Sequence, residues 1–326
     1  MLEYFAKRVL VLIPKLFIIT LLIFTGIYMV PGDPLTHMIP LSELAEFDLE
    51  HLEAMREYLG INDPFFVQYF RWLTNVLRGN FGYSLVSGGC IRASLASRLP
   101  ATMELAGLGL LISIIFGVVL GFVSAVRKNG IFDYFTTFFG MIGISVPEFF
   151  FGLLGILFFA LTLNILPTGG RMSLGNEAFV DRWQYLVMPA VCLGIALIAD
   201  LMRYTRSSML DVLSKDYIKA SQSRGTPDAV VYVKHALRNA LTPVIIIMIN
   251  RLRLLVGGTV VIENVFNYAG VGNLLLNAIS GSDMPLIMMT TLIIAVAILL
   301  ISLLMDVATV MLDPRVKIGN YAQEVH

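Results

Sequence analysis

The sequence predicts an all-α polytopic membrane protein with about six transmembrane helices. Three observations support this prediction. The 326 residues are 57% hydrophobic and only 14% charged, whereas soluble domains carry about 25% charged residues. Several apolar runs are long enough to cross a bilayer. Finally, Lys and Arg are concentrated in alternate connections between those runs.

A spanning helix needs about 20 mainly apolar residues. Six stretches meet this requirement: 9–30, 99–126, 133–163, 186–205, 241–262 and 286–312. The first is longer than the apolar region of a typical signal peptide, and no small-x-small cleavage motif follows it. We therefore expect it to be a retained helix.

Residues 31–98 are too many for a simple connection between two spans. Within them, residues 41–60 and 64–79 show helical spacing, and Gly60 and Gly79 punctuate the ends of these two pieces. We expect a small helical subdomain outside the membrane.

The third span, 133–163, contains Pro147. A proline inside a helix removes a backbone hydrogen bond, so we expect a kink at this point. Gly-rich faces such as "GLGLLISIIFGVVLG" in the second span favour close helix packing.

The distribution of Lys and Arg predicts the orientation. Lys and Arg occur near the amino terminus, at 127–128, along 206–240 and near the carboxyl terminus, whereas 264–285 has neither. We therefore expect both termini in the cytoplasm and 31–98 on the other side. Because the net charge is zero, the composition gives no reason to expect nucleic-acid binding.

Motifs of catalysis are missing from the sequence. It contains no P-loop, G-x-S-x-G, H-E-x-x-H or C-x-x-C pattern, and no His lies in a predicted span. These features disfavour an intramembrane enzyme and a metal site. Cys90 lies in a polar loop and Cys192 in an apolar run, so we expect no disulfide.

One polar stretch interrupts the apolar pattern between the fourth and fifth spans. Residues 206–240 include "KASQSRGTPDAVVYVKHALRNA", with a Gly-Thr-Pro breaker between two helical pieces. Thr226 is predicted to cap the second piece, with Pro227 at its first position. Two short cytoplasmic helices are expected. From the residues alone, a basic loop that contacts anionic lipid is an alternative.

This stretch resembles the coupling motif of ABC-importer permeases. More narrowly, the whole chain resembles the first (B-type) permease of the dipeptide/oligopeptide/nickel family. Ordered matches run along its length: "VPGDP", "QYFRWLTNVLRGNFGYSL", "RLPATMELA", "DYIKASQSRG", "HALRNALTPV", "GGTVVIENVF" and "LDPR". The Glu-Ala-Ala of the family motif reads Lys219-Ala220-Ser221 here. The resemblance implies the type I ABC importer permease fold in the bacterial or archaeal cytoplasmic membrane.

The resemblance also implies a mechanism that depends on other chains. A homologous second permease would complete the pathway, two cytoplasmic ATPases would hold ATP and Mg, and an extracytoplasmic binding protein would deliver the substrate. This chain would hold no cofactor. A helix at 216–224 would dock into one ATPase, with small residues allowing a close approach. The residues implied in coupling are Asp216, Tyr217, Lys219, Ala220, Ser221, Arg224 and Gly225.

Charged residues within spans are costly and usually face a cavity or a partner. Glu148, Asp200, Arg251 and Arg253 lie in or near apolar runs, and Glu148 and the two arginines depart from the family pattern. They form a candidate charge network in or beside the pathway. Arg251 and Arg253 point about 160° apart on a helix, so only one is expected to pair with Asp200 or Glu148.

The function expected from the residues and the resemblance together is an ATP-driven importer of di- or oligopeptides or similar small polar solutes. Nickel chelates, other metal chelates and glutathione are alternative substrates within the family. A stand-alone channel or secondary transporter is the alternative from another class, but it has no use for a docking helix.

Overall fold

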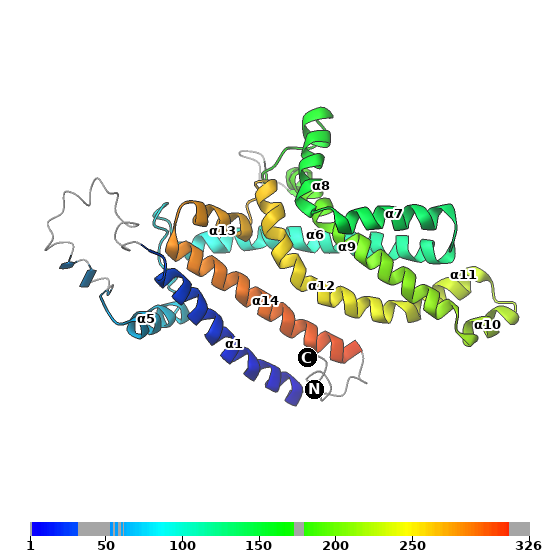
Figure 1. Ribbon diagram of the computed structural model, residues 1–326, viewed down its shortest axis with the longest axis horizontal. Coiled ribbons are helices and arrows are strands. Elements are labelled where there is room, and N and C mark those ends of the chain that lie inside the picture. Colours follow the sequence, from blue (N-terminus) through cyan, green and yellow to red (C-terminus); the bar gives the residue numbers. More distant parts are fainter. Residues whose placement is uncertain are drawn as a thin grey trace. The chain divides into compact units, whose positions relative to one another are not determined.

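Helices make up nearly all of the described chain in the computed structural model (Figure 1). Backbone is described for residues 2–31, 53–54, 56–57, 60, 62–172 and 179–312; side-chain surroundings are not described for 2–7, 179–181, 250, 252–256 and 310–312. Within these ranges the one strand-like pairing is an isolated bridge between Tyr83 and Cys90.

The helices follow one another in the order α1 (Leu2–Tyr28), α5 (Phe65–Leu77), α6 (Ile91–Val126), α7 (Ile131–Ser145), α8 (Glu148–Gly155), π-helix η1 (Ile156–Thr162), α9 (Phe179–Leu213), α10 (Asp216–Ser223), α11 (Asp228–Val230), π-helix η2 (Val231–Leu237), α12 (Arg238–Val265), α13 (Val271–Ser280) and α14 (Met284–Leu312). Five described helices are long and apolar enough to cross a membrane, and a broken pair makes up to six. The predicted fold class is confirmed.

Two predicted spans lie within helices that are much longer than the span. The span expected at 99–126 begins at Ile91, and the one expected at 186–205 extends over Phe179–Leu213. At 1.5 Å per residue, the 36 residues of α6 reach about 54 Å, well beyond a hydrocarbon core of about 30 Å. Hydropathy marks only the apolar part of such a helix, so the predicted spans are shorter than the helices that contain them.

The prediction of one kinked helix at 133–163 was wrong. α7 ends at Ser145, Val146 is extended, and α8 begins after Pro147. The axes of α7 and of the α8–η1 segment differ by 102°. A proline disfavours helical backbone at the preceding residue as well as lacking its own N–H, which explains why the helix breaks at Val146 instead of bending.

The described chain forms two compact units. The first comprises residues 1–100 and 270–300. Its core includes Ile91 and Leu95 of α6, Val271 of α13, and Met289 and Leu292 of α14. α13 was not predicted, because its ten residues are too few for a span. α5 matches the helix expected at 64–79, and Gly79 ends it with a positive φ of 78°. The helix expected at 41–60 lies largely outside the described residues.

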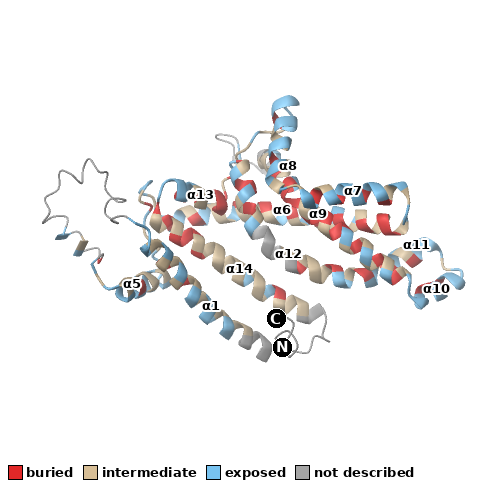
Figure 2. Cartoon of the chain, in the orientation of Figure 1, coloured by how far each residue is buried: buried red, intermediate tan, exposed pale blue. Residues whose placement is uncertain are grey.

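The second unit comprises residues 101–269 and 301–326 and is built around α9. This helix packs against α7, α8 and α12, and Figure 2 shows buried positions along it, whereas Gly152 is the one buried residue of α8. α6 also approaches α9 closely. A Cβ at Gly121 would lie 2.5 Å from the carbonyl oxygen of Met202, so the glycine-rich face packs as expected.

Candidate functional site: the polar segment and the charged groups of the helices

The polar segment after α9 forms a compact helical turn. A short connection, Ser214–Lys215, joins α9 to α10. α10 covers Asp216–Ser223, which agrees with the helix expected at 216–224, and Arg224 is its C-cap. Gly225 follows with a φ of +77° and no atom within 4 Å of a Cβ position. A side chain there would meet backbone strain and no steric clash, so Gly225 has a conformational role besides the small size expected for docking.

One face of α10 packs against the other helices of the second unit. Ile218 is buried, and so is Ser221, whose hydroxyl lies 3.3 Å from that of Thr226. Ile218 belongs to a cluster that joins four elements: Ala125 of α6, Met209 and Val212 of α9, Val231 and Ala236 of η2, and Ala240 of α12. Displacement of α10 would therefore act on several helices at once.

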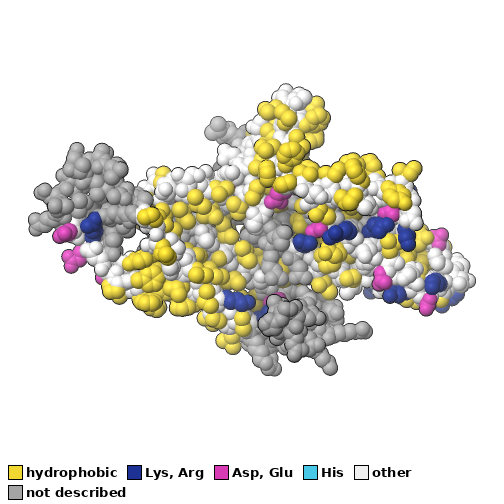
Figure 3. All heavy atoms as spheres, viewed as in Figure 1, with side chains coloured by type: hydrophobic (Ala, Val, Ile, Leu, Met, Phe, Trp, Pro, Cys, Tyr) yellow, Lys and Arg dark blue, Asp and Glu magenta, His cyan; other side chains and the backbone are white. Residues whose placement is uncertain are grey.

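The opposite face of α10 is exposed. Of the seven residues implied in coupling, six are exposed: Asp216, Tyr217, Lys219, Ala220, Arg224 and Gly225. Ser221 instead points inward. Sequence reasoning missed Ile218 as the anchoring residue, although an apolar position within this polar helix was a usable signal. Figure 3 shows charged side chains around α10 and α11, and an apolar surface over α8.

The predicted capping at Thr226 and Pro227 was wrong by one position. Pro227 is the N-cap of α11, Asp228 is its first residue, and no side-chain cap is present. The expected second short helix continues through η2 directly into α12. The helix persists through Pro243 and through the pair Gly257-Gly258.

The charged residues within the spans are only partly brought together. Arg251 of α12 lies 2.9 Å from the carboxylate of Asp200 of α9 (Nη2 to Oδ2), and Arg203 lies 3.8 Å from the same carboxylate. Glu148 begins α8, where the helix N-terminus favours a carboxylate, and it lies against Gly258. The side chain of Arg253 is outside the described residues. Within the described part, the four groups therefore give one close ion pair and no joined network.

Breaking the Asp200–Arg251 pair is expected to destabilise the protein. In a double-mutant cycle, Arg251→Ala and Asp200→Ala should show an interaction energy of about 1–2 kcal/mol, because the two groups are partly buried and in contact. The matched control is the cycle of Asp200 with Arg203, whose side chain is 64% exposed, and it should show less. Thermal unfolding in detergent measures both. If Arg251→Ala leaves stability unchanged and uncouples substrate from ATP hydrolysis, Arg251 contacts substrate instead.

A buried ion pair that sequence reasoning missed joins α6, α7 and α9. The Asp133 carboxylate receives hydrogen bonds from Arg206 at 2.6 Å (Nε) and 2.8 Å (Nη2), from the Ser124 hydroxyl at 2.5 Å and from the Asn129 N–H at 2.9 Å. The Asp133 side chain is 4% exposed and that of Arg206 29%. A carboxylate in the first turn after Gly130 was the available signal, but its partner lies 73 residues away.

A second polar cluster lies where α6, the segment before α9 and the end of α12 meet. Arg171 lies 3.0 Å from Glu104, and the Thr102 hydroxyl donates to buried Glu263 at 2.6 Å. Burial, followed by the Glu104 charge, raises the pKa of Tyr268 to about 12. This phenol is therefore a neutral hydrogen-bonding group at physiological pH. The cluster ties Glu104 into the fold.

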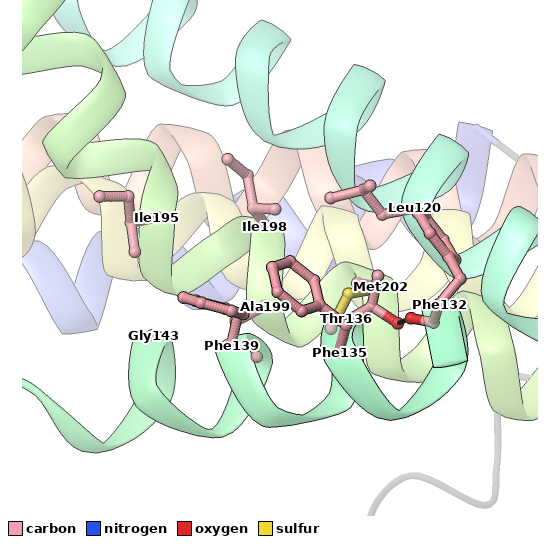
Figure 4. Close-up of a pocket in the computed structure, with 11 residues that line it drawn as sticks. Leu120, Phe132, Phe135, Thr136, Phe139, Gly143, Ile195, Ile198, Ala199 and Met202 are labelled. Carbon is pink, nitrogen blue, oxygen red and sulfur yellow. Dashed lines mark hydrogen bonds between the residues drawn. The ribbon is translucent and has the colours of Figure 1, made fainter. Parts of the chain in front are cut away.

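The cavity between α7 and α9 does not suit a polar solute. The cavity has a volume of about 220 Å³. Figure 4 shows that its lining consists mainly of Phe, Ile, Leu and Met side chains. Its one polar side chain, Thr136, donates to the backbone oxygens of Phe132 and Asp133. Apolar lining without free polar groups gives no means of orienting a peptide or ion. Among the described residues, no group of three His, Cys, Asp or Glu could hold a metal ion.

A polytopic helical protein that presents an anchored helix outside its spans has the form of a transporter subunit. Comparison with known families agrees: the model described as "Binding-protein-dependent transport system inner membrane component" matches residues 117–318, and the model of the corresponding N-terminal region matches 1–106. The chain belongs to this family. It is the multi-pass membrane permease subunit of an ABC importer.

The individual relatives carry transport names. The chain is 38% identical over 320 residues to a protein of Brucella suis biovar 1 (strain 1330) provisionally named a peptide permease, covering 98% of this chain and 100% of that one. It is 38% identical over 319 residues to the oligopeptide transport system permease protein AppB of Bacillus subtilis (strain 168), covering 97% and 100%. It is 36% identical over 317 residues to the glutathione transport system permease protein GsiC of Escherichia coli (strain K12), covering 97% and 99%.

Proposed function

We propose that this chain forms half of the translocation pathway of an ATP-driven importer of di- or oligopeptides or similar small polar solutes. The observation that carries the proposal is α10, whose buried Ile218 anchors it while Ala220 and its neighbours remain exposed. An exposed helix fixed to several spans is suited to receive force from another protein. A stand-alone channel or carrier needs no such element.

The partners in this proposal are four further chains. A homologous permease completes the pathway, two cytoplasmic ATPases bind ATP and Mg and dock on α10, and an extracytoplasmic protein delivers the substrate. The chain itself is not catalytic and holds no cofactor. Relatives that carry the names of oligopeptide and peptide permeases support the peptide assignment.

Glutathione import is a second candidate, supported by the 36% identity to GsiC over nearly the whole chain. Glutathione is itself a tripeptide, so one pathway lined for small polar solutes can suit both. Substrate choice is then expected to depend strongly on the binding protein.

Co-purification followed by reconstitution tests the proposal. The tagged chain, expressed in its own cell, should retain two ATPases and a second permease. In vesicles, the binding protein with bound substrate should stimulate ATP hydrolysis. Comparing the stimulation by peptide with that by glutathione identifies the substrate. A chain that purifies without ATPases, yet transports solute, would support the stand-alone carrier instead.

The topology gives a further expected result. In a background of Cys90→Ser and Cys192→Ala, the variant Ser87→Cys should react with an impermeant maleimide from outside intact cells. Ser223→Cys on α10 should react only after permeabilisation, because the Lys/Arg distribution predicts that α10 lies in the cytoplasm. Both positions are exposed, so reagent access is matched. Labelling of both from one side would refute the orientation.

A further inference from the structure

Helix α5 packs against the interior of the α1 span. The Tyr69 and Thr20 hydroxyls lie 2.9 Å apart, and the Tyr69 ring also meets Phe17 at 5.9 Å. The Phe65 ring lies 5.4 Å from that of Phe24 and 5.0 Å from that of Tyr28. Tyr69 is fully buried in this contact. The Trp72 ring, seven residues after Phe65, again lies 5.6 Å from that of Phe24, so α5 crosses α1 near the carboxyl end of that helix.

The contact residues on α1 give the depth of α5. The apolar span of α1 covers Arg8–Tyr28. Thr20 precedes the end of that span by eight residues, which is about 12 Å along a helix. Half of a hydrocarbon core of about 30 Å is about 15 Å. Tyr69 is thus at the depth of the acyl chains in one leaflet. Trp72 of α5 lines a cavity together with Met284 and Met288, which lie in about the first turn of α14.

The surface of α5 divides into three sectors. Tyr69 and Trp72 face α1 and the first unit's core. Beside that face, Phe66, Phe70 and Leu77 form a stripe, because positions 4 and 11 residues apart fall within about 40° on a helix. Their exposures are 64%, 53% and 79%. The remaining sector carries the polar side chains Gln68, Arg71, Thr74, Asn75 and Arg78.

We propose that α5 is an interfacial helix embedded in the leaflet at the carboxyl end of α1, with Phe66, Phe70 and Leu77 against lipid acyl chains. A helix with an apolar stripe, a basic polar face and too few residues to span fits this position. Arg71, paired with Asp63 at 2.6 Å, and Arg78 lie on the side that faces headgroups. The stripe is continuous in depth with exposed apolar residues of α1, such as Leu22. This placement replaces the expectation that all of 31–98 lies outside the membrane.

Spin-label accessibility tests the proposal in the full chain with its co-purifying subunits. Single cysteines replace Phe70, Leu77 and, as the matched control on the same helix, Asn75, in the Cys90→Ser, Cys192→Ala background. The complex is reconstituted in vesicles of phosphatidylethanolamine and phosphatidylglycerol. Leu22→Cys on α1 serves as the lipid-facing reference. Relaxation by oxygen reports lipid, and relaxation by a water-soluble nickel chelate reports water.

The ratio of oxygen to nickel accessibility should be several-fold higher at positions 70 and 77 than at position 75, and close to that at position 22. Two outcomes would overturn the proposal. Nickel accessibility at 70 and 77 equal to that at 75 would place α5 in water. Low accessibility to both reagents at 70 and 77 would mean that another protein covers the stripe. If Phe70→Cys fails to reach the membrane, Leu77→Cys, at the most exposed of the three positions, carries the test.

Discussion

Replacing Asp133 by Ala is expected to lower the free energy of unfolding by about 3 kcal/mol. The change removes four hydrogen bonds to one carboxylate and leaves the partly buried Arg206 without its counter-ion. Removing one partner of a buried pair costs about 3–5 kcal/mol, and the remaining exposure of Arg206 places this case at the lower end.

Cys192 provides the measurement, since its thiol is buried in α9. In a Cys90→Ser background, reaction of Cys192 with a fluorescent maleimide on heating in detergent reports unfolding. The matched control is Asp211→Ala, which breaks the exposed pair with Lys215 at 3.5 Å and should cost at most about 0.5 kcal/mol. Equal midpoints for the two variants would show that the Asp133–Arg206 pair does not hold α6, α7 and α9 together.

Replacing Ala220 by Arg is expected to abolish transport-linked ATP hydrolysis. Ala220 lies on the exposed face of α10, opposite the buried Ile218 and Ser221. A large charged side chain at the centre of a docking surface costs about 2 kcal/mol or more, which corresponds to roughly thirtyfold weaker binding of the ATPase. Membrane insertion should be unaffected, because the position makes no buried contact.

Gln222→Arg is the matched control, because it adds the same side chain to the same helix. Two residues apart on a helix, positions 220 and 222 point about 160° from each other. ATPase co-purification and substrate-stimulated hydrolysis should be lost in Ala220→Arg and retained in Gln222→Arg. Normal stimulation in Ala220→Arg would mean that α10 is not the docking element. Loss in both variants would indicate a docking surface wider than one face of α10.

These two predictions concern connected parts of the second unit. α9 carries Arg206 and, seven residues later, ends at Leu213 before the short connection to α10. Ile218 of α10 packs with α6, α9, η2 and α12. Displacement of α10 therefore acts on α9 through the short connection between them and through the packing of Ile218. The Asp133–Arg206 pair in turn joins α9 to α7. Loss of the pair is expected to weaken transmission as well as stability.

The candidate site was predictable only in its local part. The bounds of α10 follow from a polar helical stretch closed by Gly225, and six of the seven residues implied in coupling are exposed. Ser221 could not be assigned to the inward face, because that depends on where α9 and η2 lie. Of two acids and two arginines in the spans, the sequence offered four pairings, and helix packing brought Asp200 to Arg251.

The sequence by itself determined the approximate place of the long apolar helices, because hydropathy over about 20 residues depends on local composition alone. It also located a helix distortion at Pro147, since the proline ring acts on its immediate neighbours, although it predicted a kink and not a break. Only the tertiary structure decided the 102° angle at that break, the pairing of Asp133 with Arg206 and the position of α5 beside Thr20. Each of these features depends on how separate segments of the chain lie against one another. Packing between helices, not local preference, selects among the arrangements that the sequence allows.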